Sequence, residues 1–337
     1  MKQLSIIVPV YNVEKYIRPC VESIFRQGLT EECFEVIIVN DGTEDNSMEM
    51  IKDIISLHTN IIVINQKNQG LSMARNNGMG KATGEYILYL DSDDLLAEHC
   101  LSSLLENAIQ HKADLIVADF KKMEDEEINN YLKKTPTLQN KCEVHEETGS
   151  SLLMKHLNPS ECYVWRTLYR REFLVNNNIL FTPGIYFEDI PFTHECYLKA
   201  GKCLRTDLTI YIYRTGHASI TSVMNQKKGK DLGTSIAKTW ELRNIAGLPP
   251  VIRERLIDDV FVSLSILLYG IIHDVQDSTD RKAILKHIKE VAPDLYFAHG
   301  MKQKIMNFMY HKLLYTYISF RVLLVRLTKN HIKLWKR

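Results

Sequence analysis

The stretch EYILYLDSDD, residues 85–94, decides the fold class and points to a function. Residues 86–90 are mostly apolar and predict a buried strand, which three carboxylates follow. Residues two apart point the same way in an extended chain, so Asp91 and Asp93 can face one point. Carboxylate oxygens placed together suit Mg²⁺ or Mn²⁺, and such ions are often shared with substrate phosphates. Taken alone, the stretch is also compatible with a solvated acidic turn.

Strands and helices alternate on both sides of this stretch. Apolar, β-branched runs predict strands at 4–10, 34–39, 61–64, 86–90 and 114–118, with helical spacing between them. This order predicts an α/β fold with a doubly wound, mostly parallel sheet flanked by helices. Ligands bind such sheets at the carboxyl ends of the strands, which is where the carboxylates of 91–94 stand.

The chain beyond residue 118 is predicted to contain three further regions. Residues 119–149 are charged and poor in apolar residues, and they form an excursion from the α/β pattern. Residues 150–225 complete the domain 1–225. Residues 226–337 predict a mainly helical C-terminal region, with helices at about 234–246, 250–273, 279–290 and 303–334.

The net charge of +1 is unevenly distributed along the 337 residues. Residues 301–337 hold nine Lys and Arg and no Asp or Glu, whereas the preceding part holds 33 basic and 41 acidic residues. On a helical wheel, Arg321 and the later basic residues gather on one side. The apolar residues gather on the other side: Leu313, Tyr317, Phe320, Leu323, Leu324, Leu327, Leu334 and Trp335. We expect this basic amphipathic helix, within 303–337, to bind an anionic membrane surface. The alternative is a terminal helix that docks on the body of the protein with solvated lysines.

Several features favour a cytoplasmic protein. The seven cysteines are scattered and none forms a C-x-x-C pair, which is typical of reduced thiols. The apolar run at 4–10 is short, contains Pro9 and lacks a small-residue cleavage site, so we interpret it as a strand and not as a signal peptide. No uninterrupted apolar stretch reaches the roughly 20 residues that span a bilayer. We therefore expect a cytoplasmic protein that is peripheral on the inner face of the cell membrane.

Four motifs in this order resemble glycosyltransferase family 2. They are SIIVPVYNVEKYI at 5–17, VIIVNDGTEDNS at 36–47, NQGLSMARNNGMGKATGEYILYLDSDD at 68–94 and YFEDIPF at 186–192. Two further stretches, VWRTLYRREFL at 164–174 and IYRTGHASIT at 212–221, resemble bacterial enzymes that build capsular, exopolysaccharide or lipopolysaccharide sugars. The resemblance implies a GT-A fold in 1–225, with 150–225 on the acceptor side. It also implies an inverting transfer of a sugar from a nucleotide-sugar.

The resemblance further implies a nucleotide site at the carboxyl ends of the first strands. It assigns the N3–H of a pyrimidine base to Asp41, hence a UDP-sugar as donor; a turn-forming Asx residue is the alternative. Arg75 either contacts phosphate or braces Asp41 or Asp91 as a buried ion pair. The implied nucleotide-binding residues are Pro9, Val10, Tyr11, Asp41, Arg75, Asp91 and Ser92.

The implied metal, Mn²⁺ or Mg²⁺, would bridge the two phosphates of the donor. Asp93 is the expected ligand, together with Asp91, and Asp94 could add an outer contact. His217 is a further candidate ligand, although a loop histidine bonded to backbone is the more frequent case.

An inverting transfer also needs a base that takes the proton of the acceptor hydroxyl on the face opposite the leaving group. The resemblance assigns this role to Asp189, with Glu188 as the fallback. Without the resemblance, both would be interpreted as acids favoured at a helix N-terminus. Arg214 or Arg166 could bind the diphosphate, and Trp165 could stack on an acceptor sugar or belong to the core.

We therefore expect a hexosyltransferase-type glycosyltransferase that moves a sugar from a nucleoside-diphosphate sugar to a saccharide or lipid-linked saccharide. The alternative is a catalytically silent nucleotide-sugar-binding subunit of a polysaccharide complex. A nucleotidyltransferase or a dinucleotide-binding dehydrogenase is disfavoured, because neither a basic glycine-rich phosphate loop nor G-x-G-x-x-G follows the first strand. The acidic balance of residues 1–300 disfavours nucleic acid as a partner.

Overall fold

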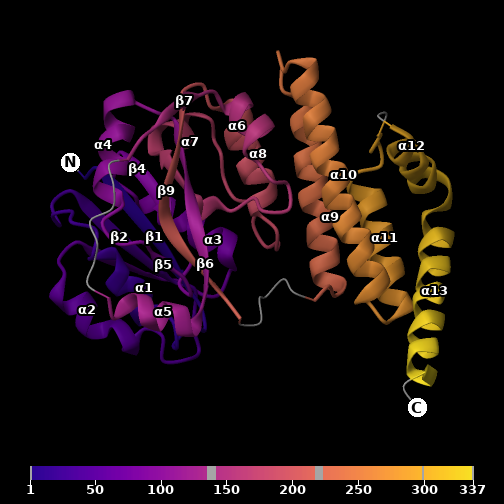
Figure 1. The fold of residues 1–337 in the computed structure, drawn as a ribbon, viewed down its shortest axis with the longest axis horizontal. Coiled ribbons are helices and arrows are strands. Elements are labelled where there is room, and N and C mark those ends of the chain that lie inside the picture. Colours follow the sequence, from indigo (N-terminus) through magenta and orange to yellow (C-terminus); the bar gives the residue numbers. More distant parts are fainter. Residues whose placement is uncertain (1, 135–141, 217–222, 298–299, 336–337) are drawn as a thin grey trace. The chain divides into compact units, whose positions relative to one another are not determined.

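The computed structural model describes residues 2–134, 142–216, 223–297 and 300–335, and Figure 1 shows its ribbon. The chain divides into two compact units. The first consists of Met1–Leu157, Tyr163–Gly184 and Phe192–His217, and the second of Asn158–Cys162, Ile185–Pro191 and Ala218–Arg337. Two short segments from the middle of the sequence therefore belong with the C-terminal helices, and one of them carries Glu188 and Asp189.

Among its described residues, the first unit is built on a nine-stranded sheet. Its strands are β1 (Leu4–Val10), β2 (Phe34–Asn40), β3 (Ile61–Asn65), β4 (Tyr86–Tyr89), β5 (Leu95–Leu96), β6 (Leu115–Glu124), β7 (His145–Glu147), β8 (Thr167–Arg170) and β9 (Cys203–Thr215). Their order is β3-β2-β1-β4-β8-β6-β9-β5, with β7 paired to β9. Strands β3, β2, β1 and β4 are parallel, so their carboxyl ends share one edge, whereas β8 is antiparallel to both of its neighbours. The predicted α/β fold with a mostly parallel sheet is confirmed.

Helices connect these strands, and the packing of helix α3 requires a glycine. They are α1 (Ile17–Ile24), α2 (Lys52–Leu57), α3 (Leu71–Lys81), α4 (Leu101–His111), α5 (Asp125–Leu132), α6 (Gly149–Lys155), α7 (Arg171–Asn176) and α8 (Asp189–Lys199). A Cβ on Gly78 of α3 would come within 2.5 Å of Cγ2 of Ile7 and 3.3 Å of Cγ2 of Val39. Glycine at this position lets α3 pack directly on β1 and β2, whose carboxyl ends border the candidate site.

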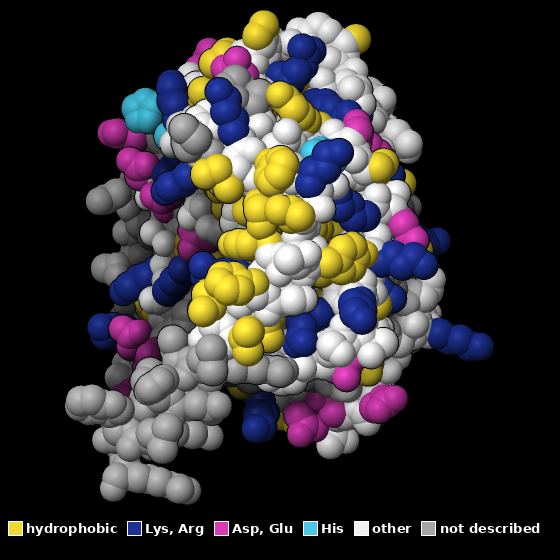
Figure 2. All heavy atoms as spheres, turned by 90° about the vertical axis from the view of Figure 1, so that its right-hand side faces the viewer, with side chains coloured by type: hydrophobic (Ala, Val, Ile, Leu, Met, Phe, Trp, Pro, Cys, Tyr) yellow, Lys and Arg dark blue, Asp and Glu magenta, His cyan; other side chains and the backbone are white. Residues whose placement is uncertain are grey.

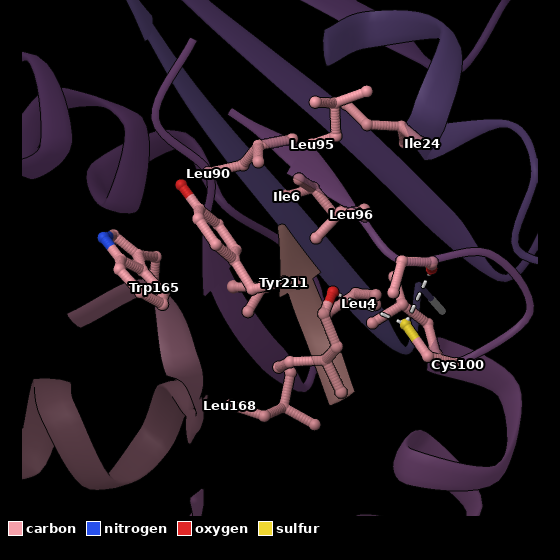
Figure 3. Close-up of a cluster of buried hydrophobic side chains, with 14 of the residues drawn as sticks. Leu4, Ile6, Ile24, Leu90, Leu95, Leu96, Cys100, Trp165, Leu168 and Tyr211 are labelled. Carbon is pink, nitrogen blue, oxygen red and sulfur yellow. Dashed lines mark hydrogen bonds between the residues drawn. The ribbon is translucent and has the colours of Figure 1, made fainter. Parts of the chain in front are cut away.

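The core of the first unit explains why the apolar runs of the sequence become strands. Every residue of β1 and β4 is buried, as expected for parallel strands covered on both faces. Figure 3 shows part of this cluster, to which Leu4, Ile6 and Leu90 contribute together with side chains from later in the chain. Full burial of one Leu or Ile side chain contributes about 1.5–3 kcal/mol, so this cluster dominates the stability of the sheet.

The strand predicted at 114–118 is longer than expected. Strand β6 continues to Glu124, because residues 119–124 pair with β9 after an irregular register near Asp119. Helix α5 follows, and a capping box between Glu124 and Glu127 satisfies its first amides. Most side chains of β6 beyond residue 118 are exposed or half-buried. Apolar periodicity therefore gives no signal for this part of the strand, although its backbone ladder is complete enough to extend the sheet.

The second unit is mainly helical, as predicted. Its helices are α9 (Gln226–Glu241), α10 (Pro250–His273), α11 (Ser278–Val291), α12 (Gly300–Phe308) and α13 (Leu314–Trp335), with a π-helical turn at Met309–Leu313 between the last two. Helix α9 begins earlier than the predicted residue 234, because the Asn225 side chain accepts a hydrogen bond from the Lys228 amide at 2.9 Å and caps the helix there.

Within the described residues, α10 is the one helix whose length and composition would allow it to cross a membrane. A buried core helix meets the same criterion, and 56% of the apolar window of α10 is buried inside the protein. Leu256, Val260, Leu264 and Leu267 form its fully buried stripe. Helix α10 packs against α9 and α13 in the second unit.

Candidate active site

Two loops at the shared carboxyl edge of the sheet are linked side by side. Three backbone amides after β1 donate to side chains in the loop after β2: Asn12 to Oγ1 of Thr43 (2.8 Å), Val13 to Oγ of Ser47 (2.9 Å) and Glu14 to Oδ2 of Asp45 (2.9 Å). Asn12 lies in the left-handed region with φ of 53°, which asparagine tolerates well. The links hold the β1 loop, and with it Tyr11, in a defined conformation beside the end of β2.

Asp45 is the acidic centre of this link. Burial works against its ionisation, but hydrogen bonds from Ser47, from the Glu14 amide and from Thr43 outweigh it and lower the pKa of Asp45 to about 2. Asp45 is therefore charged throughout the physiological range. Nothing in the sequence indicated this role of Asp45, because bonds between two loops leave no periodic signal.

Asp41, the residue expected to contact the pyrimidine, is 3% exposed and accepts three hydrogen bonds. Its Oδ1 accepts from Nε2 of Gln66 at 2.7 Å and from the Gln69 amide at 2.8 Å, and its Oδ2 accepts from the Gly70 amide at 2.9 Å. Asp41 thus ties the end of β2 to the start of α3. A carboxylate has about four acceptor positions, so Oδ2 keeps capacity for one further donor, and the contact with the base stays a prediction.

The exposed side chain of Tyr11 contrasts with its buried neighbours. Pro9 and Val10 are buried in β1, and the Val10 carbonyl accepts the Asp41 amide at 3.0 Å. Tyr11 is 42% exposed. Of the three residues expected to line the nucleotide, Tyr11 therefore offers a ring to a ligand. Pro9 and Val10 can contribute only backbone and shape.

Arg75 forms a buried ion pair with Asp91, which is one of the two alternatives that the sequence left open. Its Nη2 lies 2.7 Å from Oδ1 of Asp91, and the guanidinium lies 5.2 Å from the ring centre of Phe181. Arg75 is 3% exposed, whereas the Asp91 side chain is 25% exposed. The arginine therefore binds one oxygen of Asp91, and the side chain of Asp91 stays partly exposed. A direct contact of Arg75 with phosphate stays a prediction.

The acidic turn, residues 91–94, follows β4. The Asp94 amide donates to the Asp91 carbonyl at 3.1 Å, so these residues form a turn and the extended conformation expected for them is wrong. The expected alternation of side chains nevertheless holds. Ser92 and Asp94 are buried, at 6% and 1% exposed, whereas Asp91 and Asp93 are intermediate. The two predicted metal ligands are thus the two accessible carboxylates of the turn.

Asp94 anchors the turn to β9. Its Oδ2 accepts from the Tyr211 hydroxyl at 2.8 Å and its Oδ1 from the Arg214 amide at 2.7 Å. Burial and the charge of Asp93 raise the pKa of Asp94 well above its usual range, although both hydrogen bonds favour the carboxylate. The predicted outer contact of Asp94 with a metal stays a prediction, and its observed contacts are structural.

Arg214 and Arg166, the candidates for diphosphate binding, are both engaged inside the first unit. Arg214 donates from Nε to the Asp93 carbonyl at 2.7 Å and pairs with Asp125. Arg166 donates from Nε to the Ala118 carbonyl at 3.1 Å. Arg214 therefore braces the backbone of the acidic turn. His217, the further candidate ligand, lies outside the described residues.

The oxygen donors of the acidic turn fit Mg²⁺ or Mn²⁺. Asp91 and Asp93 offer hard carboxylate oxygens on the accessible side of the turn, and both ions accept such ligands with phosphate oxygens and waters completing the shell. In the part of the chain that the structure describes, no group of three or more His, Cys, Asp or Glu residues is arranged to hold a metal ion. A metal at this turn would complete its shell with phosphate oxygens of the substrate and with waters.

Trp165 belongs to the core, in agreement with the second of its two interpretations. It is 3% exposed and stacks between Tyr163, at 4.6 Å between ring centres, and Tyr211, at 4.0 Å. Figure 3 shows Trp165 beside Tyr211, whose hydroxyl reaches toward the acidic turn. The stack packs beneath the acidic turn through Tyr211, and both faces of the Trp165 ring are covered, so it cannot stack on an acceptor sugar.

The second unit holds the predicted base in a strained segment. Phe187 has a φ of 63°, a costly conformation for a bulky residue, of the order of 1–3 kcal/mol. Helix α9 stabilises it: Ser235 Oγ donates to the Phe187 carbonyl at 2.6 Å, and Asp231 accepts the Tyr186 amide at 3.1 Å.

Glu188 and Asp189 follow this strained residue and differ in exposure. Glu188 is 6% exposed, whereas Asp189 is intermediate and is the first residue of α8. The more accessible carboxylate is thus the one that the sequence selects as the base. Sequence reasoning missed Asp231 and Ser235, because no motif marks them and they lie on a helix far along the chain.

Comparisons with known proteins agree with this geometry. A family model described as glycosyl transferase family 2 matches residues 5–175. The chain is 38% identical over 222 residues to the uncharacterized glycosyltransferase EpsJ of Bacillus subtilis, covering 65% of this chain and 63% of that protein. It is 28% identical over 203 residues to the poly(ribitol-phosphate) beta-glucosyltransferase of Bacillus spizizenii, covering 59% of this chain and 30% of that protein. The match thus spans less than two thirds of the length of either relative.

Solved structures share the fold at low sequence identity. A crystal structure of S. aureus TarS 1–349 in complex with UDP-GlcNAc matches with a TM-score of 0.69 and 19% identity, covering 95% of this chain and 88% of that one. The mannosyltransferase PcManGT from Pyrobaculum calidifontis, in complex with GDP-Man and Mn²⁺, matches with a TM-score of 0.50 and 13% identity, covering 95% and 87%. At these identities the likeness shows the fold alone.

Proposed function

The chain belongs to glycosyltransferase family 2, and we propose that it transfers a hexose from a UDP-sugar to a saccharide or lipid-linked saccharide in cell-surface polysaccharide synthesis. The observation that carries this proposal is the acidic turn. Its two accessible carboxylates, Asp91 and Asp93, stand at the shared carboxyl edge of the parallel strands, where sheets of this kind bind ligands. Arg75 binds the Asp91 carboxylate and Arg214 binds the Asp93 carbonyl, so the turn that carries both residues is held before a substrate binds.

The proposed donor site lies between the β1 loop, the end of β2 and the acidic turn. Asp41 would accept the N3–H of uracil with its remaining acceptor position, and Tyr11 would cover the base with its exposed ring. Asp91 and Ser92 would face the nucleotide. UDP is proposed because a relative of the same fold, TarS, has been crystallised with UDP-GlcNAc.

The carboxylates of Asp91 and Asp93 would hold the proposed metal. A bound Mg²⁺ or Mn²⁺ would act as a Lewis acid that offsets the charge developing on the departing diphosphate. Arg75 neutralises part of the charge on Asp91 and keeps its carboxylate oriented. Arg214 holds the Asp93 carbonyl and thereby the conformation of the turn.

Asp189 is the proposed base. It would take the proton of the acceptor hydroxyl while the oxygen attacks the anomeric carbon from the face opposite the diphosphate. The bond between that carbon and the phosphate oxygen breaks, its electron pair leaves with UDP, and the configuration inverts. The partly exposed Asp189 suits this role better than the buried Glu188, which could instead orient the acceptor.

The acceptor is proposed to be a polymer or lipid-linked precursor of the bacterial cell surface. Support comes from the poly(ribitol-phosphate) beta-glucosyltransferase among the relatives and from the motifs that resemble capsular and lipopolysaccharide enzymes. Such precursors are assembled at the membrane, so we place the enzyme in the cytoplasm at its inner face.

A thermal-shift screen tests the proposal directly. A ligand that binds the folded state raises its stability by RT ln(1 + [L]/Kd), which is about 2.7 kcal/mol at a hundredfold excess over Kd. We expect one UDP-sugar to raise the unfolding temperature in the presence of Mn²⁺ and much less in EDTA. The variant Asp93→Ala should lose the Mn²⁺-dependent part. Donor binding without transfer to any acceptor would favour the catalytically silent subunit, and no shift with any nucleotide-sugar would contradict the proposal.

A further inference from the structure

The C-terminal helices of the second unit use one stripe to pack against their neighbours. Tyr310, Leu314, Ile318 and Val322 are each at most 6% exposed, and α13 contacts α10 and α11. The Tyr310 hydroxyl donates to the carbonyls of Ile288, at 3.1 Å, and Ala292, at 2.8 Å. The terminal helix therefore docks on the body of its unit, which was one of the two alternatives left open by the sequence.

The docking leaves another set of apolar side chains in solvent. We call them the C-terminal apolar face: Phe308 (57% exposed), Leu313 (41%), Phe320 (57%), Leu323 (53%) and Leu324 (40%). At about 100° per residue within α13, Phe320 and Leu324 lie about 40° apart and about 140° round the helix from the stripe of Leu314, Ile318 and Val322. Figure 2 shows hydrophobic side chains gathered into a continuous band on this side of the protein, with Lys and Arg around it. Four residues of the predicted apolar side, Leu313, Phe320, Leu323 and Leu324, are thus exposed, although the helix is docked.

Cations accompany this face. Lys302, Lys304, Lys312 and Arg321 are exposed on the same helices, and residues 301–337 contain no Asp or Glu. Five more Lys and Arg follow in the sequence between 326 and 337. An apolar stripe flanked by cations matches the boundary of an anionic bilayer, where phosphate groups lie directly above acyl chains.

Other occupants match the face less well. A second copy of the chain would place the same face against itself in a twofold dimer and bring its cations together, which costs free energy. The phosphates of a nucleic acid would pair with the lysines and arginines. The exposed Phe and Leu side chains, however, would find no apolar partner on a phosphate backbone.

We propose that the C-terminal apolar face docks α12 and α13 along the surface of an anionic lipid bilayer. Phe308, Phe320 and Leu324 enter the boundary between headgroups and acyl chains, and Lys312 and Arg321 reach the lipid phosphates. The stripe at 310, 314, 318 and 322 keeps the helices on the protein while the outer side binds lipid. This proposal does not depend on sugar transfer, because the surface is complete without donor or acceptor.

Vesicle flotation of the full chain, without nucleotide, tests this surface. Wild type should float with vesicles of equimolar phosphatidylcholine and phosphatidylglycerol and bind pure phosphatidylcholine far less, with binding that weakens as salt rises. The double variant Phe320→Ser/Leu324→Ser should bind the anionic vesicles at least about tenfold more weakly. The matched control is Leu57→Ser/Val175→Ser, which removes two exposed apolar side chains from the first unit and should bind like wild type.

A pair of charge-reversal variants measures the electrostatic contribution to vesicle binding. Lys312→Glu/Arg321→Glu should weaken binding and flatten its salt dependence, whereas Lys81→Glu/Lys121→Glu, exposed lysines of the first unit, should do neither. Thermal unfolding of every variant checks that the fold is kept. The proposal is contradicted if the wild type binds neither kind of vesicle. It is also contradicted if both C-terminal variants bind anionic vesicles as strongly as the wild type does. Sedimentation that shows a lipid-free dimer, dissociated by Phe320→Ser/Leu324→Ser, would instead assign the face to self-association.

Discussion

The acidic turn of the first unit and the segment before α8 in the second unit carry the two kinds of carboxylate that the proposed reaction needs, and they are held in different ways. The acidic turn is fixed by buried side chains of its own sheet unit: Arg75 holds Asp91, and Tyr211 and Arg214 hold Asp94. Asp189 follows a strained residue, Phe187, whose carbonyl is held by Ser235 of α9. One site is therefore built into the sheet, and the other depends on a helix outside the matched family region.

This contrast suggests a division of labour. Residues 5–175, which match the family, contain the acidic turn and the loops after β1 and β2. Asp231 and Ser235, which bond the segment before Asp189, lie beyond that match. We therefore expect donor chemistry to be set by the first region and acceptor geometry to be tuned by α9. Variants on either side should consequently separate donor binding from transfer.

Removal of Asp93 should have the largest effect. Asp93→Ala takes away the expected metal ligand, and we predict that kcat/KM falls by about 10³-fold or more, because charge on the departing diphosphate is no longer offset. Initial rates with and without added Mn²⁺ measure this. Asp207→Ala, in which an 87% exposed side chain is removed, is the control. Wild-type activity that persists in EDTA would show that the turn does not act through a metal.

Asp189→Asn should strongly reduce transfer while leaving donor binding intact. A general base contributes about 10²–10⁴-fold, so kcat should fall within that range. The donor Kd, measured by thermal shift, should stay unchanged. Glu188→Gln is the matched variant, since it changes the buried neighbour in the same way. If Glu188→Gln is the variant that loses transfer, the two acids have exchanged roles.

Ser235→Ala should lower activity by changing the position of the segment that carries Asp189, and not by removing a contact with the substrate. Loss of the bond to the Phe187 carbonyl should relax the strained residue and lower kcat by about tenfold, with the donor Kd unchanged. The cost in stability should be about 1 kcal/mol. Ser265→Ala removes a similar bond, to the Phe261 carbonyl in α10, and serves as the control. Equal kcat in the two variants at equal stability would show that Ser235 has only a structural role.

Asp45→Asn should have the smallest effect, a loss of stability that is present near neutral pH and fades in acid. The folded pKa of Asp45 is about 2, below its ordinary value of 3.8, so its contribution is complete above about pH 4 and is lost as the pH falls toward 2. A shift of this size corresponds to about 1–2 kcal/mol, reduced by solvent screening. Denaturant titrations of both proteins at pH 6 and in acid measure the difference. It should shrink as the pH falls; a constant difference would mean that the link between the loops does not depend on charge.

The acidic turn shows how far local pattern carries a prediction. The apolar run of β4 and its trailing carboxylates place the site at the edge of the sheet, and the exposure of Asp91 and Asp93 follows the expected alternation. The conformation was nevertheless predicted incorrectly. The Asp94 amide bonds back to the Asp91 carbonyl, and β9 captures the Asp94 side chain from a distant part of the sequence. A contact between residues so far apart in the chain cannot be predicted from the local sequence pattern.

The terminal helix shows the complementary case. Its amphipathic pattern is plain in the sequence, and the structure shows the docked alternative, whereas binding to a membrane stays a proposal. The helix docks through Tyr310, Leu314, Ile318 and Val322, yet Phe320 and Leu324 remain exposed. A helix with apolar residues on more than one side can satisfy one partner and retain another face, and the sequence cannot say which side the body will cover.

By itself, the sequence determined the α/β class, the succession of the first strands along the chain and the residue types at their carboxyl ends. These follow from the period of apolar residues and from chemistry that sits next to each strand in the chain. The tertiary structure alone decided which of these groups are anchored and by what. It paired Arg75 with Asp91 and not with Asp41, engaged Arg214 within the turn, placed Trp165 in the core and brought Ser235 to Phe187. Such partners are chosen by packing of distant segments, because burial leaves each polar group only the neighbours that the fold supplies.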